Sequence, residues 1–198
     1  MKEFKQTWWD DNLEKRMDEF QSWIGSAESQ SKVEVREFVK HGCYKSLVDI
    51  GCGTATEFFA YQKEYPELKY LGIDSCKLLN KMNTERGVPM LECSCEKIDL
   101  PDKSYQIAFS RHVLEHQPNF EETLNEMIRV SSMLAIHVFF IPPSENGETI
   151  SYDPNQNLYH NQYNKGKIEA FLNKHERADS FFWKQVNASE WLLIIDTQ

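Results

Sequence analysis

The segment Val48-Asp49-Ile50-Gly51-Cys52-Gly53-Thr54 decides the fold of this chain. An apolar strand at residues 46–50 leads into it, and a helical pattern at residues 57–65 follows it. The two glycines permit a tight turn in which the backbone can approach a ligand closely, and the start of a helix adds free N–H donors. A GxG turn is also common where nothing binds, so its meaning depends on the rest of the chain.

Strands and helices alternate through most of the remaining sequence. Apolar runs predict further strands at residues 69–73, 88–93, 105–110 and 133–141, with helical patterns between most of them. Repeated units of this kind form a parallel sheet that helices cover on both faces. Two more strands, at 180–186 and 190–196, are joined by so short a turn that they must be antiparallel. We therefore predict a doubly wound α/β fold that ends in an antiparallel hairpin.

The first 44 residues precede this alternation and are expected to form a helical cap. Asp10 can cap a helix that runs to about residue 24, and Ser31 with Glu34 has the pattern of a capping box for a second helix. Residues 45–198 then form the core. Within the core, residues 142–165 are rich in Pro, Asn and Tyr, and irregular connections of this length are either functional lids or disordered. We expect a lid.

Composition restricts the partners of the protein. The chain has 198 residues and a formal net charge of −9, and its longest basic run is two residues, which argues against a nucleic-acid groove. The five cysteines lack CxxC spacing and are expected to be reduced structural thiols, with no metal site. No signal peptide and no apolar run of membrane-spanning length are present. We therefore expect a cytoplasmic protein that acts on a small molecule, and the oligomeric state stays open.

An acidic residue follows the glycine turn at the distance that ribose binding requires. Asp74 ends the second strand about 20 residues after the glycines, where a carboxylate can accept both ribose hydroxyls. Thr56 stands where a pyrophosphate-binding fingerprint has its final glycine. The sequence thus favours a ligand that has a ribose and lacks a pyrophosphate, and it disfavours a nicotinamide cofactor.

Three segments resemble a known family. VDIGCGTATEF (48–58), YLGIDSC (70–76) and CSCEKIDLPDKSYQIAFSRHVLEH (93–116) are similar to the successive motifs of class I S-adenosylmethionine-dependent methyltransferases, in particular the branch, often called type 11, that acts largely on small molecules. The resemblance implies a Rossmann-like, mostly parallel seven-stranded sheet of order 3-2-1-4-5-7-6. It also implies S-adenosylmethionine as cofactor and methyl transfer to a small acceptor, with O-methylation as one form.

The resemblance also assigns residues to the cofactor. Gly51 and Gly53, within the loop that includes Asp49 and Cys52, would pass under the methionine part. The ribose would be held by Asp74, with Ser75 beside it near the adenine. Ser94 and Cys95 are expected at the adenine edge. Ser110 and Arg111 are expected at the methionine side, and Arg36 from the N-terminal cap is expected to reach the cofactor carboxylate. The sequence departs from the family where Ala55 replaces a frequent third glycine and where Ser94 replaces a frequent Asp.

Histidines and tyrosines are the candidates for the acceptor side. A general base is needed only for a protonated acceptor such as a hydroxyl, and histidine suits that role near neutral pH. His112 and His116 are the candidate bases at the expected mouth, and His160 of the lid is a third. Tyr159 and Tyr163 are expected to form a wall of the acceptor site. The identity of the acceptor stays open.

Two other functions remain to be compared with methyl transfer. His112-Val113-Leu114-Glu115-His116 matches HxxEH, a zinc-hydrolase signature that requires an uninterrupted helix. Pro118 follows at once and argues against such a helix. The second alternative is a module that binds S-adenosylmethionine and transfers no methyl group.

Overall fold

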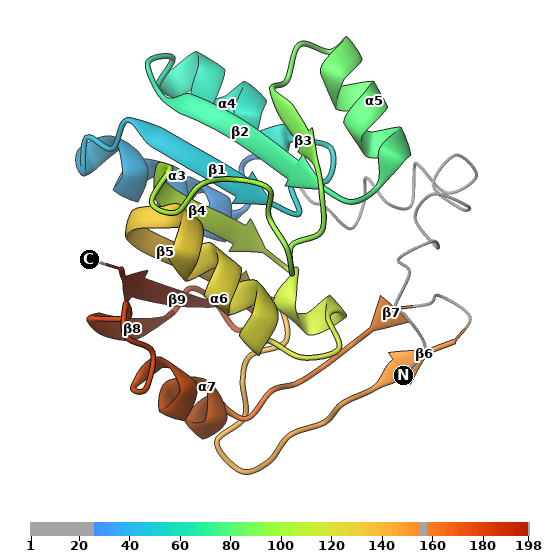
Figure 1. Cartoon of the computed structure of the whole chain (residues 1–198), viewed down its shortest axis with the longest axis vertical. Helices are drawn as coiled ribbons and strands as arrows, with labels where there is room; N and C mark the ends of the chain where they lie inside the picture. Colours follow the sequence, from blue (N-terminus) through green and yellow to red (C-terminus); the bar gives the residue numbers. More distant parts are fainter. Residues whose placement is uncertain (1–25, 155–157, 198) are drawn as a thin grey trace.

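A seven-stranded sheet forms the centre of the molecule (Figure 1). The computed structural model describes residues 26–154 and 158–197. The sheet order is β3-β2-β1-β4-β5-β9-β8, and only β9 runs antiparallel to its neighbours β5 and β8. The strands are β1 (Ser46–Ile50), β2 (Lys69–Asp74), β3 (Met90–Glu92), β4 (Tyr105–Arg111), β5 (Ser131–Phe139), β8 (Ser180–Gln185) and β9 (Trp191–Asp196). The predicted strand order and the antiparallel closing hairpin are confirmed.

Helices cover both faces of the sheet (Figure 1). Apolar side chains of α3 (Gln30–His41) and α4 (Thr56–Glu64) pack on one face. Those of α6 (Glu121–Val130) and α7 (Lys165–Leu172) pack on the other. A further helix, α5 (Lys77–Glu85), connects β2 to β3.

The central strands are buried on both faces, as parallel strands in such folds are. Along β1, Leu47 contributes to the core on the α3 side, whereas Val48 and Ile50 contribute to the core on the α6 side. This alternation follows from the period of two in a strand. The sheet is therefore fixed between two apolar layers, which hold the ends of its strands at defined positions.

Several predicted boundaries are corrected. Helix α3 begins at Gln30 and its N-cap is Ser29, so the predicted capping box at Ser31 is wrong. Ser31 is instead buried within the first turn and donates a hydrogen bond to Glu190 at 2.9 Å. Strand β5 begins at Ser131, two residues earlier than predicted. The predicted helix at residues 10–24 lies outside the described residues.

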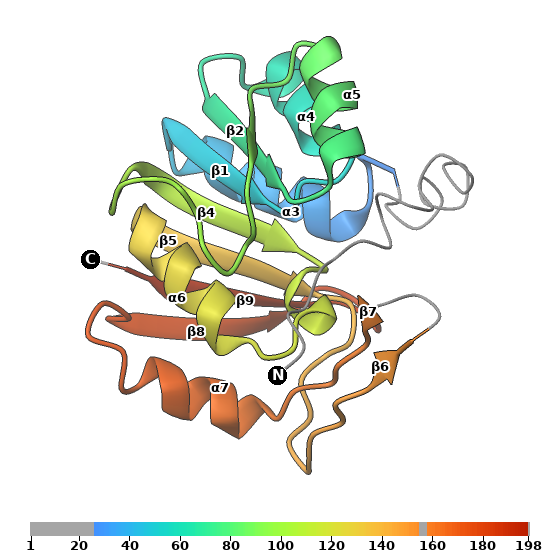
Figure 2. The same ribbon diagram turned by 45° about the vertical axis from the view of Figure 1, so that its right-hand side comes forward.

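The predicted lid contains a small sheet of its own. Strands β6 (Tyr152–Asp153) and β7 (Leu158–Tyr159) pair in antiparallel fashion, and β7 lies beside the 3-10 turn η2 (Leu114–His116) that follows β4 (Figure 2). Within the described residues, the helices are too short or too polar to cross a bilayer.

Candidate active site

A cavity of about 550 Å³ opens at the carboxyl ends of the parallel strands. Binding sites in open α/β sheets lie at this edge, and ligand pockets usually measure roughly 300–1,000 Å³. The described residues that line the cavity come from α3, the loops after β1, β2, β3 and β4, residue 140 after β5, and the lid. The cavity thus has a cofactor half around β1–β3 and an acceptor half around β4, β5 and the lid.

The glycine loop lines the cavity with backbone atoms, because Gly51 and Gly53 have no side chains. Gly51 has φ +70°, and a Cβ built there would lie 2.4 Å from Cγ2 of Val113. Gly53 also has a positive φ, +56°. The position of the missing third glycine, Ala55, takes up φ +53°, a conformation that glycine adopts with less strain. Gly51, Gly53 and Ala55 thus all have a left-handed backbone, although Ala55 replaces the frequent third glycine.

Asp74 joins the end of β2 to the glycine loop. One carboxylate oxygen accepts a hydrogen bond from the Gly53 N–H at 3.0 Å, and the other accepts from the Cys76 N–H at 2.9 Å. The side chain also lines the cavity, with Ser75 beside it. Since each carboxylate oxygen has a second lone pair, Asp74 can still accept from ligand hydroxyls.

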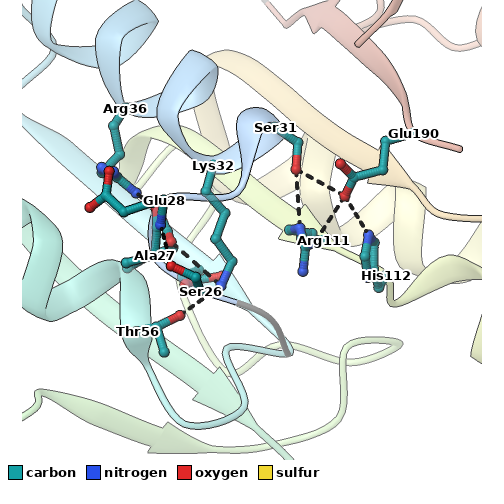
Figure 3. Close-up of polar contacts among 12 residues, drawn as sticks. Ser26, Ala27, Glu28, Ser31, Lys32, Arg36, Thr56, Arg111, His112 and Glu190 are labelled. Carbon is teal, nitrogen blue, oxygen red and sulfur yellow. Dashed lines mark hydrogen bonds and ion pairs between the residues drawn. The ribbon is translucent and has the colours of Figure 1, made fainter. Parts of the chain in front are cut away.

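Lys32, Asp49 and Glu57 line one end of the cofactor half. Lys32 donates to Oγ1 of Thr56 at 2.9 Å (Figure 3). Its Nζ also lies 3.8 Å from Oε1 of Glu57. That Oε1 atom is buried and has no hydrogen-bond partner. A buried carboxylate oxygen without a donor is costly unless a ligand satisfies it. This end of the cavity is thus suited to a ligand that carries an ammonium and a carboxylate.

Burial shifts the titration of all three groups. It raises the pKa of Asp49 to about 7, in spite of a hydrogen bond of 2.7 Å from the hydroxyl of Tyr70. It also raises the pKa of Glu57, against the attraction of Lys32 and Arg36. Burial lowers the pKa of Lys32, and Glu57 opposes this effect. Without a ligand the acids resist ionisation, so a cationic ligand would stabilise their charged forms.

Arg36 does not reach the cavity, which corrects its predicted role. It is buried and binds Glu57 at 3.2 Å, Glu64 at 3.3 Å and the carbonyl of Ala27 at 2.7 Å. Lys32, one turn earlier on α3, is the basic residue of this helix that lines the cavity. The prediction chose the correct helix and the wrong turn of it.

At the opposite end of the cofactor half the lining is apolar. Cys93 and Cys95 both line the cavity, together with Ile73 and Leu79. Burial raises the pKa of the Cys95 thiol to about 12, so it stays protonated. Such walls suit the faces of an adenine ring.

Two predicted cofactor contacts lie away from the cavity. Ser94 is exposed, and its hydroxyl accepts from the N–H of Glu96 at 3.2 Å. Ser110 is fully buried and lies 2.6 Å from Nδ1 of His137. Alternation along the chain turns both side chains away from the site, so the geometry does not support either as a cofactor contact.

His112 and Arg111 meet at Glu190, a residue just before β9 (Figure 3). Oε1 of Glu190 accepts from Arg111 at 2.8 Å, from Nε2 of His112 at 3.0 Å and from Ser31 at 2.9 Å. Burial would raise the pKa of Glu190, but the hydrogen bonds from His112 and Asn187 and the charge of Arg111 hold it well below its usual value. Burial lowers the pKa of His112, so its imidazole is neutral near pH 7.

His116 and His160 complete the acceptor half. Nδ1 of His116 lies 2.7 Å from the carbonyl oxygen of Tyr159, and its ring packs edge-on against His160 at 5.2 Å. Phe140 contacts the rings of both His112 and His116, at 4.9 and 5.2 Å between centroids. Burial also lowers the pKa of His116.

The two predicted tyrosines do not line the cavity. Tyr163 is buried in the core, where its hydroxyl donates to the carbonyls of Leu114 and Gln117, both at 2.9 Å. Tyr159 contributes its backbone carbonyl to His116, and its ring packs against Tyr152. The prediction that both form a wall of the acceptor site is therefore wrong. Tyr163 instead fixes the lid to the turn that carries His116.

The HxxEH match does not form a metal-binding helix. His112 has φ +59°, and the helical part is a single 3-10 turn of three residues. Glu115 points into the core, where it accepts from the Phe140 N–H and contacts Nε2 of His137. No cluster of three or more metal-ligating side chains occurs in residues 26–154 and 158–197.

Sequence reasoning missed three charged residues of the site. Lys32 and Glu57 lie on amphipathic helices whose polar positions resemble ordinary surface residues. Glu190 lies in a hairpin far along the chain from everything it contacts on α3 and β4. A weak signal existed for Glu57, because an acid in the first turn after the glycine loop lies beside that loop.

Comparisons with known proteins agree with this geometry. Residues 48–135 match the methyltransferase domain family. A comparison with curated protein sequences gave no match. Many solved structures are similar in fold. One is magnesium protoporphyrin IX methyltransferase from Synechocystis PCC 6803 with bound SAH, at 12% identity and TM-score 0.69, covering 98% of this chain and 100% of that one.

Two further structures extend the likeness. The 1,6-didemethyltoxoflavin-N1-methyltransferase of Burkholderia thailandensis, with its substrate and S-adenosylhomocysteine bound, has 14% identity and TM-score 0.69, covering 95% of this chain and 86% of that one. The PH0226 protein of Pyrococcus horikoshii OT3 has 14% identity and TM-score 0.59, covering 86% and 93%. The fold is that of the class I methyltransferases. Residues 48–135 thus match a methyltransferase domain family within a fold that solved methyltransferases share.

Proposed function

We propose that the protein transfers the methyl group of S-adenosylmethionine to a small-molecule acceptor bound beside His112 and His116. The observation that carries the proposal is the single cavity whose two halves differ in character: charged groups and glycines on one side, imidazoles and Phe140 on the other. Two structurally similar proteins are named for small acceptors, a toxoflavin precursor and magnesium protoporphyrin IX, which supports an acceptor of this kind.

The residues of the cofactor half fit S-adenosylmethionine. Asp74 would accept from the ribose hydroxyls, and the free Oε1 of Glu57 would accept from the ammonium group. Lys32 would bind the carboxylate, and Cys93 and Cys95 would contact the adenine. When bound, the cofactor supplies an activated methyl group on a sulfonium. The chain itself has to hold the acceptor in line with that group and exclude water, which contributes several kcal/mol.

We further propose that the N-terminal cap and the lid within the core serve the acceptor side. Residues 1–44 would act as a cap, of which α3 already packs on the sheet through Val35 and Val39. Residues 142–165 would act as a lid, since Leu158 and His160 line the cavity. We assign no nucleic-acid or membrane partner.

Calorimetric titration with S-adenosylhomocysteine tests the cofactor half. We expect micromolar binding, and a loss of about 10- to 100-fold in D74N, because a carboxylate that accepts from hydroxyls makes stronger hydrogen bonds than an amide does. E92Q is the matched control, since Glu92 ends the neighbouring strand β3 and is exposed outside the cavity. Absence of binding at millimolar ligand would refute the proposal.

A further inference from the structure

The two imidazoles of the acceptor half are each held in one tautomer by a partner that can only accept. Nε2 of His112 faces the ionised carboxylate of Glu190 at 3.0 Å, so Nε2 carries the proton. Nδ1 of His116 faces the carbonyl oxygen of Tyr159 at 2.7 Å, so Nδ1 carries the proton. In a neutral imidazole the other nitrogen has a lone pair. Nδ1 of His112 and Nε2 of His116 are therefore both hydrogen-bond acceptors.

These lone pairs belong to residues that line the cavity. Among the described residues, neither nitrogen has a hydrogen-bond donor. Burial lowers the pKa of both histidines, which keeps them neutral and able to accept near pH 7. Both residues are only partly buried where they line the cavity, so a ligand that donates to both nitrogens can replace solvent at each of them.

The surroundings of the imidazoles are flat and apolar. The Phe140 ring contacts both of them, and Val113 and Leu158 line the same half of the cavity. An aromatic ligand would pack on these side chains at little cost in conformational entropy.

Resting on the proposed methyl transfer, we infer that the acceptor is an aromatic molecule with two O–H or ring N–H donors, one of which gives its proton to Nδ1 of His112 while the other donates to Nε2 of His116. As the acceptor atom bonds to the methyl carbon, the carbon–sulfur bond breaks and leaves its electron pair on sulfur, and the acceptor's proton stays on His112. The products are a methylated acceptor, a neutral thioether and an imidazolium.

His112 is the base because its partner is an anion. The imidazolium formed on His112 would be hydrogen-bonded to the carboxylate of Glu190, whereas an imidazolium on His116 would be hydrogen-bonded to a carbonyl oxygen and attracted by Glu115 only through space. Glu190 acts through His112 and is a positioning residue. Its other contacts, to Arg111 and Ser31, hold the carboxylate in place.

Nitrogen NMR of protein labelled with ¹⁵N-histidine, saturated with S-adenosylhomocysteine, tests the inference without an activity assay. Long-range ¹H–¹⁵N spectra distinguish the tautomers, and His→Gln variants assign the signals. We expect His112 as the Nε2–H form and His116 as the Nδ1–H form at pH 7.5. H41Q is the matched control, because His41 is exposed at the end of α3 and does not line the cavity, and it should leave both tautomers unchanged. Finding His116 as the Nε2–H form, or either ring protonated at this pH, would overturn the inference.

Probe binding tests the acceptor class. Catechol, resorcinol and hydroquinone present two hydroxyls at three separations, and their dimethyl ethers lack the donors. We expect at least one diphenol to shift Nδ1 of His112 and Nε2 of His116, and to bind about tenfold or more tightly than its ether. Equal effects of diphenols and ethers, or no effect of any diphenol, would refute the two-donor acceptor even where S-adenosylhomocysteine binds. Failure of S-adenosylhomocysteine to bind would refute the proposed function as well.

The role of Glu190 is tested by titration of His112. The charged and titratable groups that face this ring are Arg111 on β4, Glu115 and His116 on the turn, and Glu190 before β9. In E190Q the anion is lost, so the pKa of His112 should fall further and its NMR titration should move to lower pH. A merely structural role would leave this midpoint unchanged, and that result would contradict the assignment.

Discussion

The cofactor half and the acceptor half of the cavity are built in different ways. Much of the cofactor half comes from successive strand ends, and its central contact joins Gly53 to Asp74, 21 residues apart. The acceptor half joins residues that are distant in the chain: Ser31 to Glu190 over 159 residues and His116 to Tyr159 over 43. A site made of consecutive segments can be recognised as motifs, whereas a site made of distant segments exists only after folding.

The largest effect is expected at the glycine loop. G51A would place a Cβ 2.4 Å from Val113 at φ +70°, so we expect the free energy of unfolding to fall by about 2–4 kcal/mol and S-adenosylhomocysteine affinity to fall about 100-fold. Gly87 has φ +82°, and a Cβ added there would have no other atom within 4 Å. G87A should therefore lose only about 1–2 kcal/mol and keep its affinity. Denaturant unfolding and calorimetry measure both. Equal effects would mean that backbone strain, and not close approach, explains Gly51.

The next comparison separates the two buried basic residues of α3, Lys32 and Arg36. R36M leaves the buried Glu57 and the half-buried Glu64 without their partner, so we expect a loss of about 2–4 kcal/mol in the free energy of unfolding. K32M should cost less than about 1 kcal/mol, since burial already disfavours the charge on Lys32, yet it should weaken S-adenosylmethionine binding about tenfold. A stability loss in K32M as large as in R36M would contradict the assignment of Lys32 to the ligand.

A pair of buried tyrosines allows the two halves to be perturbed separately. Y70F removes the donor to Asp49, and Y163F removes the donor to Leu114 and Gln117. Each should lower the free energy of unfolding by about 1–2 kcal/mol. Y70F should weaken S-adenosylhomocysteine binding several-fold and leave the His116 tautomer intact. Y163F should leave S-adenosylhomocysteine binding unchanged and alter the His116 tautomer. Calorimetry measures the binding and NMR the tautomer. Similar effects of both variants on both measurements would show that the two halves cannot be perturbed separately.

The smallest effect is a pH-dependent one at Asp49. Its pKa is about 7 in the fold, above the value of about 3.9 in an unfolded chain. Its contribution to stability is therefore fully present below pH 4 and is lost as the pH rises through about 7. D49N lacks this loss, so relative to the wild type it should gain about 1 kcal/mol between pH 6 and pH 7. Thermal unfolding without ligand at the two pH values measures it, and a constant difference would contradict the raised pKa.

The sequence could predict the sheet because its signals are local. Strand periodicity, the short turn at residues 187–189 and the glycine loop each lie within about ten residues, and the strand order followed from them with the family resemblance. Asp74 was also predictable, since its spacing from the glycines reflects one βαβ unit.

Side-chain direction at the edges of elements was harder to predict. Ser94 and Ser110 sit beside residues that line the cavity and still point away, because a shift of one residue in an extended segment reverses the face. The choice of Arg36 was wrong for a different reason, since Lys32 and Arg36 both lie on α3 and only the folded contacts show which of them lines the cavity. Tyr163 resembled a lid residue in composition, and only the folded contacts show it in the core.

The contacts of Glu190 also set an order of assembly. Chains are made from the N-terminus onward, and contacts between distant residues form at a higher entropic cost than local ones. The glycine loop, Asp74 and the cysteines of the cofactor half can meet once β4 has been synthesised. The carboxylate that holds Ser31, Arg111 and His112 together is absent until residue 190 has been added. A nascent chain should thus form the cofactor half of the cavity well before Glu190 can hold His112, the proposed base, in place.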